Sequence, residues 1–206
     1  MNLARQLEQG IAELDIQLEA EIQQKLLKYL GLLEKWNKVY NLTAIRNVEQ
    51  MVSYHLLDSL SVLPHLWSGK WLDVGCGAGL PGIVLALAQP DWSFTLLDSN
   101  SKKTSFVQQA VIELGLTNVV VKCARVEELQ TEEKFDGIIS RAFAETREFL
   151  SLTRHLLAAK GKWAAMKGTP EQELQHLPDH VMVEQAIQLK VPGLDAARCL
   201  VILKAI

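Results

Sequence analysis

The stretch that decides the fold is WLDVGCGAGLPG, residues 71–82. A short apolar run at 71–74 leads into glycines at alternate positions, which are Gly75, Gly77 and Gly79. Alternating glycines permit a tight turn and leave no side chains to block a ligand that lies against the backbone. In open α/β sheets, ligands bind at the carboxyl ends of the strands, which is where this loop must fall. The segment therefore predicts a strand, a ligand-binding loop and a helix.

Beyond Lys70, short apolar runs alternate with helical stretches, as is typical of a parallel sheet with helices on both faces. The expected strands are 71–74, 94–97, 119–123, 137–139 and 162–166, and the expected helices are 82–89, 101–114 and 145–159. Two last apolar runs, 181–189 and 199–203, are separated by a short turn, which favours an antiparallel pair. The predicted fold is a Rossmann-like, seven-stranded α/β sheet whose last strand is antiparallel.

The N-terminal third has a different pattern. Apolar residues at three- and four-residue steps predict one amphipathic helix over 3–18 and a second over 22–36, before a break at 40–43. A third helix follows, with Asn47 as its cap and Gln50 placed to close a capping box. We therefore expect a helical extension over residues 1–66 and a ligand-binding domain over residues 67–206.

The glycine loop alone is ambiguous, because residues 77–82 also satisfy the GxGxxG spacing of nicotinamide- and flavin-binding folds. In those folds the first glycine of the fingerprint follows the strand directly, but here Gly75 takes that place. One acid, Asp73, precedes the glycines, and a second, Asp98, ends the next strand. S-adenosylmethionine carries a cationic amine, a sulfonium and ribose hydroxyls, so carboxylates suit it, and Asp98 is expected to accept from the ribose diol.

This pairing predicts a class I methyltransferase domain with S-adenosylmethionine as its cofactor. After the strand at 119–123, Val126 is placed to pack on an adenine and Glu127 to bond its edge. Taken alone, Glu127 is explained better as a solvated carboxylate at a helix start. Arg141 leaves the fourth strand toward the same cleft.

With these residues assembled, the sequence closely resembles the bacterial 16S rRNA guanine-N7 methyltransferase G family, also called glucose-inhibited division protein B. The resemblance spans nearly the whole chain. It rests on WNKVYNLTAI (36–45), HLLDSL (55–60), LDVGCGAGLPG (72–82), LLDS (96–99), RVE (125–127), ISRA (139–142) and MKG (166–168). It implies transfer of a methyl group to N7 of one guanosine in 16S rRNA of the small ribosomal subunit.

The resemblance also implies roles for single residues. Gly75, Leu80, Val126, Glu127 and Arg141 match the family's cofactor contacts, which join Asp73, Gly77, Gly79 and Asp98 as expected cofactor-binding residues. N7 of guanine carries a lone pair and no proton, so no general base is expected. Arg141 and Lys167 are expected to position guanine O6 or an RNA phosphate, unless they are ordinary surface cations. The expected RNA contacts are Lys38, Asn41, Arg46, His55 and Arg125, although His55 lies on an apolar stripe that suits a core residue.

Composition sets further bounds. No run approaches the ~20 apolar residues of a membrane helix, and the N-terminus lacks a signal peptide, so a cytoplasmic protein without a membrane partner is expected. The three cysteines are far apart, which indicates neither disulfides nor a metal site. The net charge of −3 means that RNA contact requires a local basic face. We expect a monomer.

Two alternatives stay open. The same fold supports methyltransferases that act on a small molecule or a protein. The second alternative is a non-enzymatic RNA-binding module with a decayed cofactor pocket. The intact Asp73, glycines and Asp98 argue against this alternative. The exact nucleotide, and the choice between naked rRNA and the assembled subunit, are not determined by the sequence.

Overall fold

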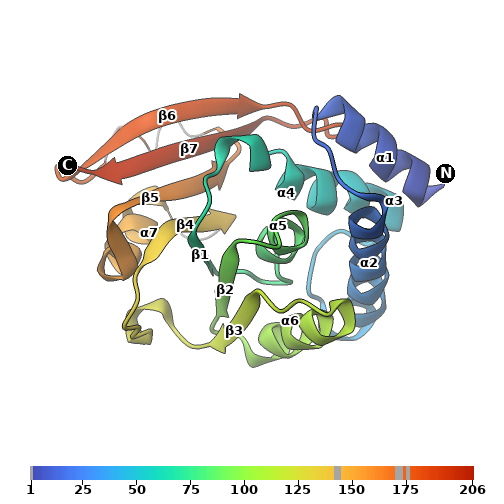
Figure 1. Cartoon of the computed structure of the whole chain (residues 1–206), viewed down its shortest axis with the longest axis horizontal. Helices are drawn as coiled ribbons and strands as arrows, with labels where there is room; N and C mark the ends of the chain where they lie inside the picture. The colour runs from blue at the N-terminus through green and yellow to red at the C-terminus, as the bar shows by residue number, and fades with distance from the viewer. Residues whose placement is uncertain (1, 142–144, 170–173, 175–176) are drawn as a thin grey trace.

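One seven-stranded sheet runs through the molecule, in the order β3-β2-β1-β4-β5-β7-β6 (Figure 1). The computed structural model describes residues 2–141, 145–169, 174 and 177–206. The strands are β1 (Lys70–Val74), β2 (Ser93–Asp98), β3 (Val119–Cys123), β4 (Phe135–Arg141), β5 (Leu157–Lys167), β6 (Val181–Leu189) and β7 (Arg198–Ala205). Strands β1 to β5 pair in parallel, whereas β7 is antiparallel to both β5 and β6. The predicted sheet is confirmed, including its antiparallel end.

Helices cover both faces of this sheet (Figure 1). They are α1 (Leu3–Glu13), α2 (Ala20–Tyr40), α3 (Val48–Met51), α4 (Asp58–Leu60), α5 (Gly82–Ala88), α6 (Ser101–Leu114) and α7 (Thr146–Thr153), with a π-helical segment at Val52–Leu57 and 3₁₀ turns at Leu63–His65, Val126–Glu128 and Arg154–Leu156. The N-terminal helices lie with α5 and α6, and α7 lies on the opposite side. Among the described residues, no helix combines the length and apolarity needed to cross a bilayer.

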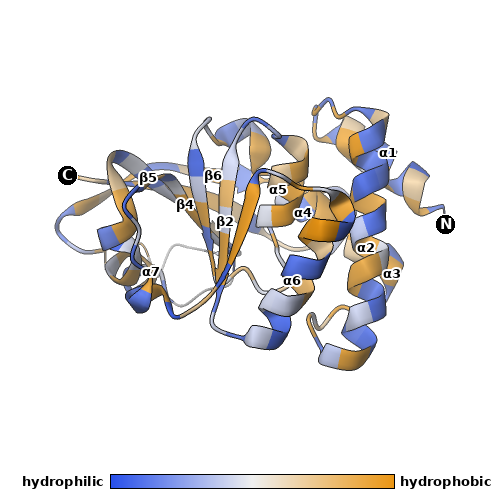
Figure 2. Cartoon of the chain, turned by 60° about the horizontal axis from the view of Figure 1, so that its bottom comes forward, coloured by the Kyte–Doolittle hydropathy of each residue, from blue (hydrophilic) through white to orange (hydrophobic). Residues whose placement is uncertain are grey.

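Two hydrophobic clusters hold the layers together, one on each face of the sheet. Along β1, Trp71 packs into the cluster that contains α5 and α6, while Leu72 and Val74 pack into the cluster that contains α7. This alternation follows from the pleat, which points successive side chains to opposite faces. Figure 2 shows the resulting apolar colouring along the central strands. The N-terminal helices share the first cluster, through residues such as Tyr29 and Leu56, so they pack directly on the sheet's helical layer.

The first and third predicted helices differ from the observed ones. The first ends at Glu13 and not near Leu18, because the chain turns at Asp15, whose φ is +55°. Leu18 still packs against the core, but from a loop. The third begins at the Asn47 cap as predicted and then widens into the π-helical segment before Asp58. An apolar stripe does not distinguish the two helical geometries.

The helix predicted over 145–159 is also shorter than expected. It ends at Thr153, and Leu157 already begins β5. Gly161, which we expected just past the helix end, lies within β5, where a Cβ would come 2.7 Å from the carbonyl oxygen of Phe135. The apolar run at 156–159 suits a helix end and a strand start equally well, since short apolar runs carry no distinguishing period.

Candidate functional site

The glycine loop turns sharply at the carboxyl end of β1. Gly75, Gly77 and Gly79 have φ values of +68°, +59° and +87°, a region that residues with a side chain rarely adopt. The backbone N–H groups of Gly75 and Cys76 donate to the carbonyl of Leu97, at 2.8 and 3.0 Å, and so tie the loop to the end of β2. The alternating glycines therefore allow the backbone to make this sharp turn, as predicted.

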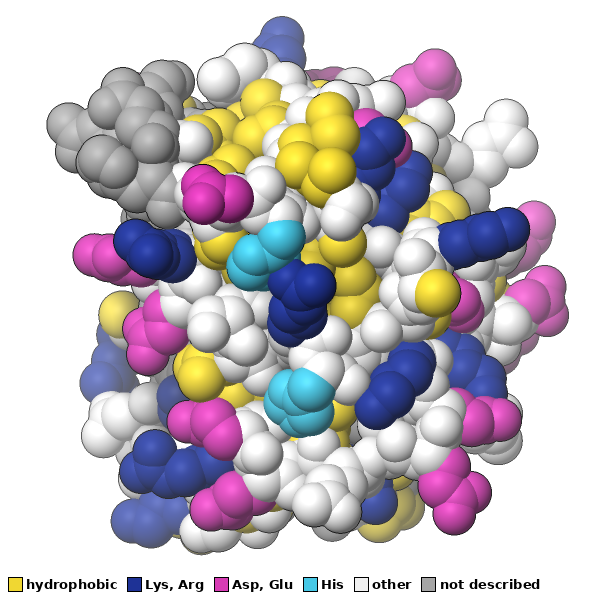
Figure 3. All heavy atoms as spheres, turned by 90° about the vertical axis from the view of Figure 1, so that its left-hand side faces the viewer, with side chains coloured by type: hydrophobic (Ala, Val, Ile, Leu, Met, Phe, Trp, Pro, Cys, Tyr) yellow, Lys and Arg dark blue, Asp and Glu magenta, His cyan; other side chains and the backbone are white. Residues whose placement is uncertain are grey.

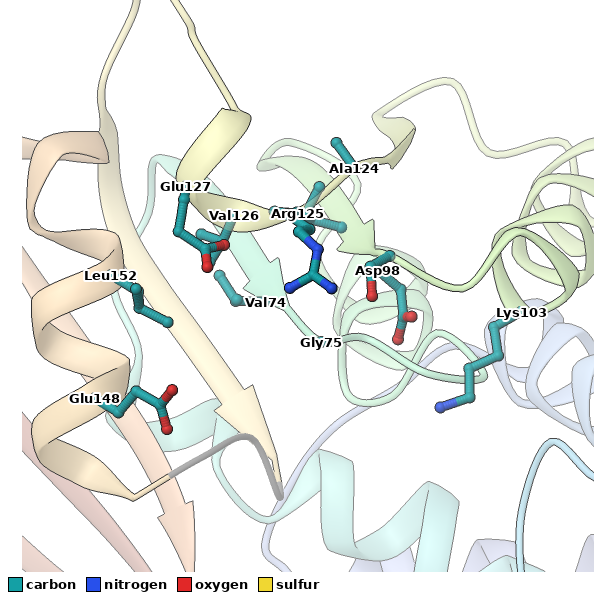
Figure 4. A pocket seen from close by; sticks show the side chains of 12 residues that line it. Val74, Gly75, Asp98, Lys103, Ala124, Arg125, Val126, Glu127, Glu148 and Leu152 are labelled. Carbon is teal, nitrogen blue, oxygen red and sulfur yellow. The ribbon is translucent and has the colours of Figure 1, made fainter.

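Asp98 organises the loop from the end of β2. One carboxylate oxygen, Oδ2, accepts from the Gly77 N–H at 2.9 Å, and Oδ1 accepts from the Asn100 N–H at 2.8 Å. A carboxylate has about four lone-pair sites, so each oxygen can accept one further bond. Figure 4 shows this carboxylate at the edge of a pocket. Asp98 is thus a preorganised acceptor for ligand hydroxyls.

The pocket beside Asp98 has a volume of about 360 Å³ (Figure 4). Its lining residues are Val74, Gly75, Leu97, Asp98, Ser99, Lys103, Ala124, Arg125, Val126, Glu127, Glu148 and Leu152. Five charged side chains, those of Asp98, Lys103, Arg125, Glu127 and Glu148, line it together with apolar ones such as Val126 and Leu152. The structure brings together four of the predicted cofactor residues here, Gly75, Asp98, Val126 and Glu127. Arg125, which we predicted as an RNA contact, lines the same pocket.

Three lining residues come from helices, and none of these three was predicted as a site residue from the sequence. Lys103 comes from α6, and Glu148 and Leu152 come from α7, which closes the opposite side of the pocket (Figure 4). Glu148 and Leu152 are four residues apart and so share one face of their helix. From the sequence, that spacing shows only that the two side chains lie together. Their position beside the glycine loop follows from the packing of α7 on the sheet, which the sequence does not show.

Asp73 lies beneath the loop and is fully buried. Its Oδ2 accepts from the Gly82 N–H at 2.8 Å, which links β1 to the first turn of α5. Its Oδ1 is buried and has no hydrogen-bond partner among the described residues. Burial raises the pKa of Asp73 to about 7, although the Gly82 N–H and the positive charge of Arg141 lower it. An added donor, such as a ligand amine, would satisfy the remaining oxygen.

The raised pKa of Asp73 predicts how stability depends on pH. In the unfolded chain the carboxyl has a pKa near 3.8 and in the folded chain a pKa of about 7, so between these values the folded state holds the extra proton. The free energy of unfolding should therefore fall as pH rises from about 4 to about 7, by an amount on the order of a few kcal/mol. Asp73→Asn cannot ionise and should lack this component.

Urea unfolding of wild type and of Asp73→Asn, at about pH 5 and about pH 8, measures the difference. The variant should gain stability relative to wild type at the higher pH. Equal pH dependence in the two proteins would show that Asp73 has an ordinary pKa.

The N-terminal helices support the loop from below. The phenol of Tyr29, in α2, donates to the carbonyl of Ala78 at 2.6 Å. Tyr29 is fully buried, and burial raises its pKa far above the usual value. A buried carbonyl that loses its donor keeps the full cost of desolvation. The extension is therefore connected to the loop by a buried bond as well as by apolar packing.

Replacing Tyr29 by Phe should reduce the free energy of unfolding by about 1–3 kcal/mol, because the Ala78 carbonyl is left without its donor. Denaturant titration checks this value. Tyr40→Phe is the matched control, since Tyr40 is 44% exposed and should change stability by less than about 0.5 kcal/mol. Equal effects at the two positions would mean that the buried bond contributes nothing.

Arg141 and Lys167 end neighbouring strands at the same edge of the sheet, as predicted. The Nη1 atom of Arg141 donates to the Tyr54 carbonyl and to Asp58 Oδ2, both at 3.1 Å. Arg141 therefore reaches toward the N-terminal helices and is not among the residues that line the pocket. Leu80, another predicted cofactor contact, is buried in the core with Cys76 and Ala78. The described residues contain no cluster of His, Cys, Asp or Glu suited to a metal ion.

The five predicted RNA contacts lie in different surroundings, although two of them, Asn41 and Arg46, are hydrogen-bonded to each other. Lys38 is exposed and pairs with Glu34, and Arg46 donates to Asn41, which ends α2 with a φ of +49°. His55 is only 5% exposed, and its Nε2 lies 3.0 Å from the hydroxyl of Thr43. Its pKa is lowered to about 4, mainly by burial and also by Arg141, so the imidazole is neutral. The burial of His55 agrees with the core alternative that its place on an apolar stripe suggested.

On the side of the molecule opposite the N-terminal helices, the described residues form no broad basic surface. Figure 3 shows Lys and Arg interspersed with Asp and Glu on that face. Mixed charges give little net attraction for a polyanion.

Solved structures with a similar fold include several methyltransferases. TrmN from Thermus thermophilus superposes with a TM-score of 0.57 at 18% identity, covering 72% of this chain and 48% of that one. A precorrin-6y C5,15-methyltransferase from Geobacter metallireducens gives 0.55 at 14% identity, over 80% and 90% of the two chains. TYW2 from M. jannaschii, solved in complex with AdoMet, gives 0.50 at 14% identity, over 66% and 69%. These likenesses confirm the class I methyltransferase fold.

Sequence comparison is more specific. Proteins named ribosomal RNA small subunit methyltransferase G match from Laribacter hongkongensis, at 57% identity over 98% of both chains, and from Chromobacterium violaceum, at 56% over 95% of both. The protein of that name from Neisseria meningitidis serogroup B is 52% identical over 98% of this chain and 99% of its own. The family model described as rRNA small subunit methyltransferase G matches residues 22–201. This chain therefore belongs to the rRNA small subunit methyltransferase G family.

Proposed function

We propose that this protein transfers a methyl group from S-adenosylmethionine to N7 of a guanosine in 16S rRNA of the small ribosomal subunit. The name shared by its relatives supports an rRNA substrate. The observation that carries the proposal is the pocket at the carboxyl edge of the sheet, where the glycine loop, Asp98 and the Val126–Glu127 turn meet. An rRNA substrate implies that the enzyme works in the cytoplasm. It also argues against the alternative of an enzyme that acts on a small molecule.

The residues present fit the cofactor. Asp98 offers acceptor capacity for the ribose hydroxyls, and Val74, Leu97 and Val126 offer apolar surface for the adenine. At Gly77, an added Cβ would meet only the Gly75 carbonyl, at 3.9 Å, so the loop backbone stays open to a ligand. The Oδ1 atom of Asp73 has no hydrogen-bond partner among the described residues, so it can accept from the amine of the cofactor. When bound, S-adenosylmethionine supplies an electrophilic methyl group on a sulfonium.

The chain's own task is then to position the guanine. N7 attacks through an in-plane lone pair and releases no proton, so no residue has to act as a base. Holding the reacting atoms in line supplies on the order of 7–11 kcal/mol through effective concentration. Arg141 and Lys167 are the proposed donors to guanine O6 or to phosphate. His55, which is neutral and buried, serves the fold of the extension at residues 1–66.

Methyl transfer to RNA tests the proposal. Small subunits from cells that lack this gene, and naked 16S rRNA from the same cells, would be incubated with the protein and tritiated S-adenosylmethionine. Borohydride and aniline cleavage then locates N7-methylguanosine. We expect label at N7 of one guanosine. RNA from the mutant cells, which is unmethylated at that position, should accept the label, and wild-type RNA should not.

The same assay separates the alternative substrates. Label in the protein fraction, or in a small-molecule fraction of a cell extract with none in RNA, would refute the rRNA assignment. Absence of S-adenosylmethionine binding by calorimetry would identify a decayed pocket.

A further inference from the structure

Asp58 is a buried carboxylate held between two arginines. Its residue is 1% exposed. Oδ2 accepts from Nη1 of Arg141 at 3.1 Å, and Oδ1 accepts from Nε of Arg198 at 2.9 Å. The two arginines lie 83 and 140 residues further along the chain, at the end of β4 and the start of β7. The cluster therefore joins the N-terminal extension to two neighbouring regions at the carboxyl edge of the sheet.

The cluster fixes one side of the Arg141 guanidinium. Nη1 also donates to the Tyr54 carbonyl at 3.1 Å, so this nitrogen is shared between a carboxylate and a carbonyl of the π-helical segment. Nε and Nη2 make no hydrogen bond to any residue that the structure describes. The side chain is 23% exposed. A guanidinium has five N–H donors, so within the part of the chain that the structure describes those on Nε and Nη2 are not taken up.

Stability alone does not explain this arrangement. A buried ion cluster is costly to desolvate, and apolar side chains of similar volume often give equal or greater stability. Such a cluster does, however, restrict a long side chain to one orientation. The π-helical segment beside it is a rare conformation that is frequent at functional sites.

We infer that Asp58 is a positioning residue for methyl transfer: it fixes the guanidinium of Arg141 so that its remaining N–H groups face the guanine, with Arg198 as the second anchor. This inference rests on the proposed function, because it assigns the substrate contact to Arg141. Asp58 itself touches no substrate.

Asp58→Asn tests the inference, since it keeps the size of the side chain and removes the charge that holds both arginines. We expect kcat for RNA methylation to fall about 10- to 100-fold, the scale of a misplacement of about 1 Å. The Kd for S-adenosylmethionine should stay within about threefold, because neither Asp58 nor Arg141 lines the pocket.

Glu184→Gln is the matched control. Glu184 also accepts from two cations, Lys162 and Lys204, but these lie in the middle of β5 and near the end of β7, away from the carboxyl edge of the sheet. Its kcat should remain within about twofold of wild type. Equal losses in the two variants, in proportion to lowered melting temperatures, would make Asp58 a structural residue only.

A double-mutant cycle with Arg141→Ala gives the sharpest readout. If Asp58 acts through Arg141, Asp58→Asn should lower kcat no further once Arg141 is gone. Multiplicative losses would overturn the inference. If Asp58→Asn does not fold, Arg198→Met decides the matter, because it removes the second anchor from a partly exposed position and leaves the pair of Asp58 with Arg141.

We expect Arg198→Met to lower kcat about 3- to 10-fold, and to have no further effect in the Arg141→Ala background. An unchanged kcat overturns the inference. These outcomes differ from failure of the proposed function, in which the wild-type protein itself would transfer no methyl group to 16S rRNA.

Discussion

Asp98→Ala is expected to raise the Kd for S-adenosylmethionine by about 100-fold or more. The change removes the carboxylate proposed to accept from the ribose, and it also frees the Gly77 and Asn100 N–H groups that Asp98 now binds. Each hydrogen bond to a charged group contributes about 1.5–3 kcal/mol, and about 1.4 kcal/mol is a tenfold change in affinity. Isothermal titration calorimetry measures the effect directly.

Asp136→Ala is the control for this variant. Asp136 also accepts from a backbone N–H, that of Lys70 at 2.9 Å, but at the start of β1, away from the pocket. Its Kd for the cofactor should stay within about twofold of wild type. An Asp98→Ala protein that folds and binds S-adenosylmethionine normally would remove Asp98 from the site.

Arg141→Ala is expected to lower kcat for RNA methylation about 100- to 1000-fold, the usual cost of losing one preorganised donor. The Kd for S-adenosylmethionine should change less than about threefold, because Arg141 lies beside the pocket and not in its lining. Arg141→Lys should restore little, since an ammonium cannot reproduce the planar fork of N–H donors. Because N7 needs no base, the residual rate of Arg141→Ala should not depend on the ionisation of a general base. Single-turnover kinetics with saturating RNA separates kcat from binding.

Arg154→Ala provides the comparison, because Arg154 is an exposed arginine in the 3₁₀ turn after α7. It should retain a kcat within about twofold of wild type. A loss confined to the Kd for S-adenosylmethionine in Arg141→Ala would instead assign Arg141 to the cofactor, as the family resemblance alone suggests.

The order of strands and helices was predictable because both periodicities are strong in this chain. The apolar runs that became β1, β2 and β3 are short and separated by helical stretches, and the glycine loop marks the first crossover. The errors fall where the local pattern is compatible with two geometries. The run after Leu156 continues as β5 and not as helix, and the stripe after Asn47 widens into a π-helical segment at Val52–Leu57.

The candidate site was predictable where its residues follow strands. Gly75, Asp98, Val126 and Glu127 come from three successive strand ends, which a parallel sheet places at one edge. Contacts between distant segments were not predictable. No local signal links Asp58 to Arg198, and none directs Glu148 to the pocket. For His55 the sequence left two possibilities open, because a polar residue on an apolar stripe can be a core residue or a contact, and its burial became known only from the structure.

The measurement that tests the central claim most directly is a crystal structure of the protein with S-adenosylmethionine or its demethylated product bound. We predict that the ligand occupies the pocket between the glycine loop, Val126 and α7, with its ribose on the Asp98 carboxylate. Ligand bound elsewhere on the chain, with this pocket empty or holding a nicotinamide nucleotide instead, would contradict the assignment.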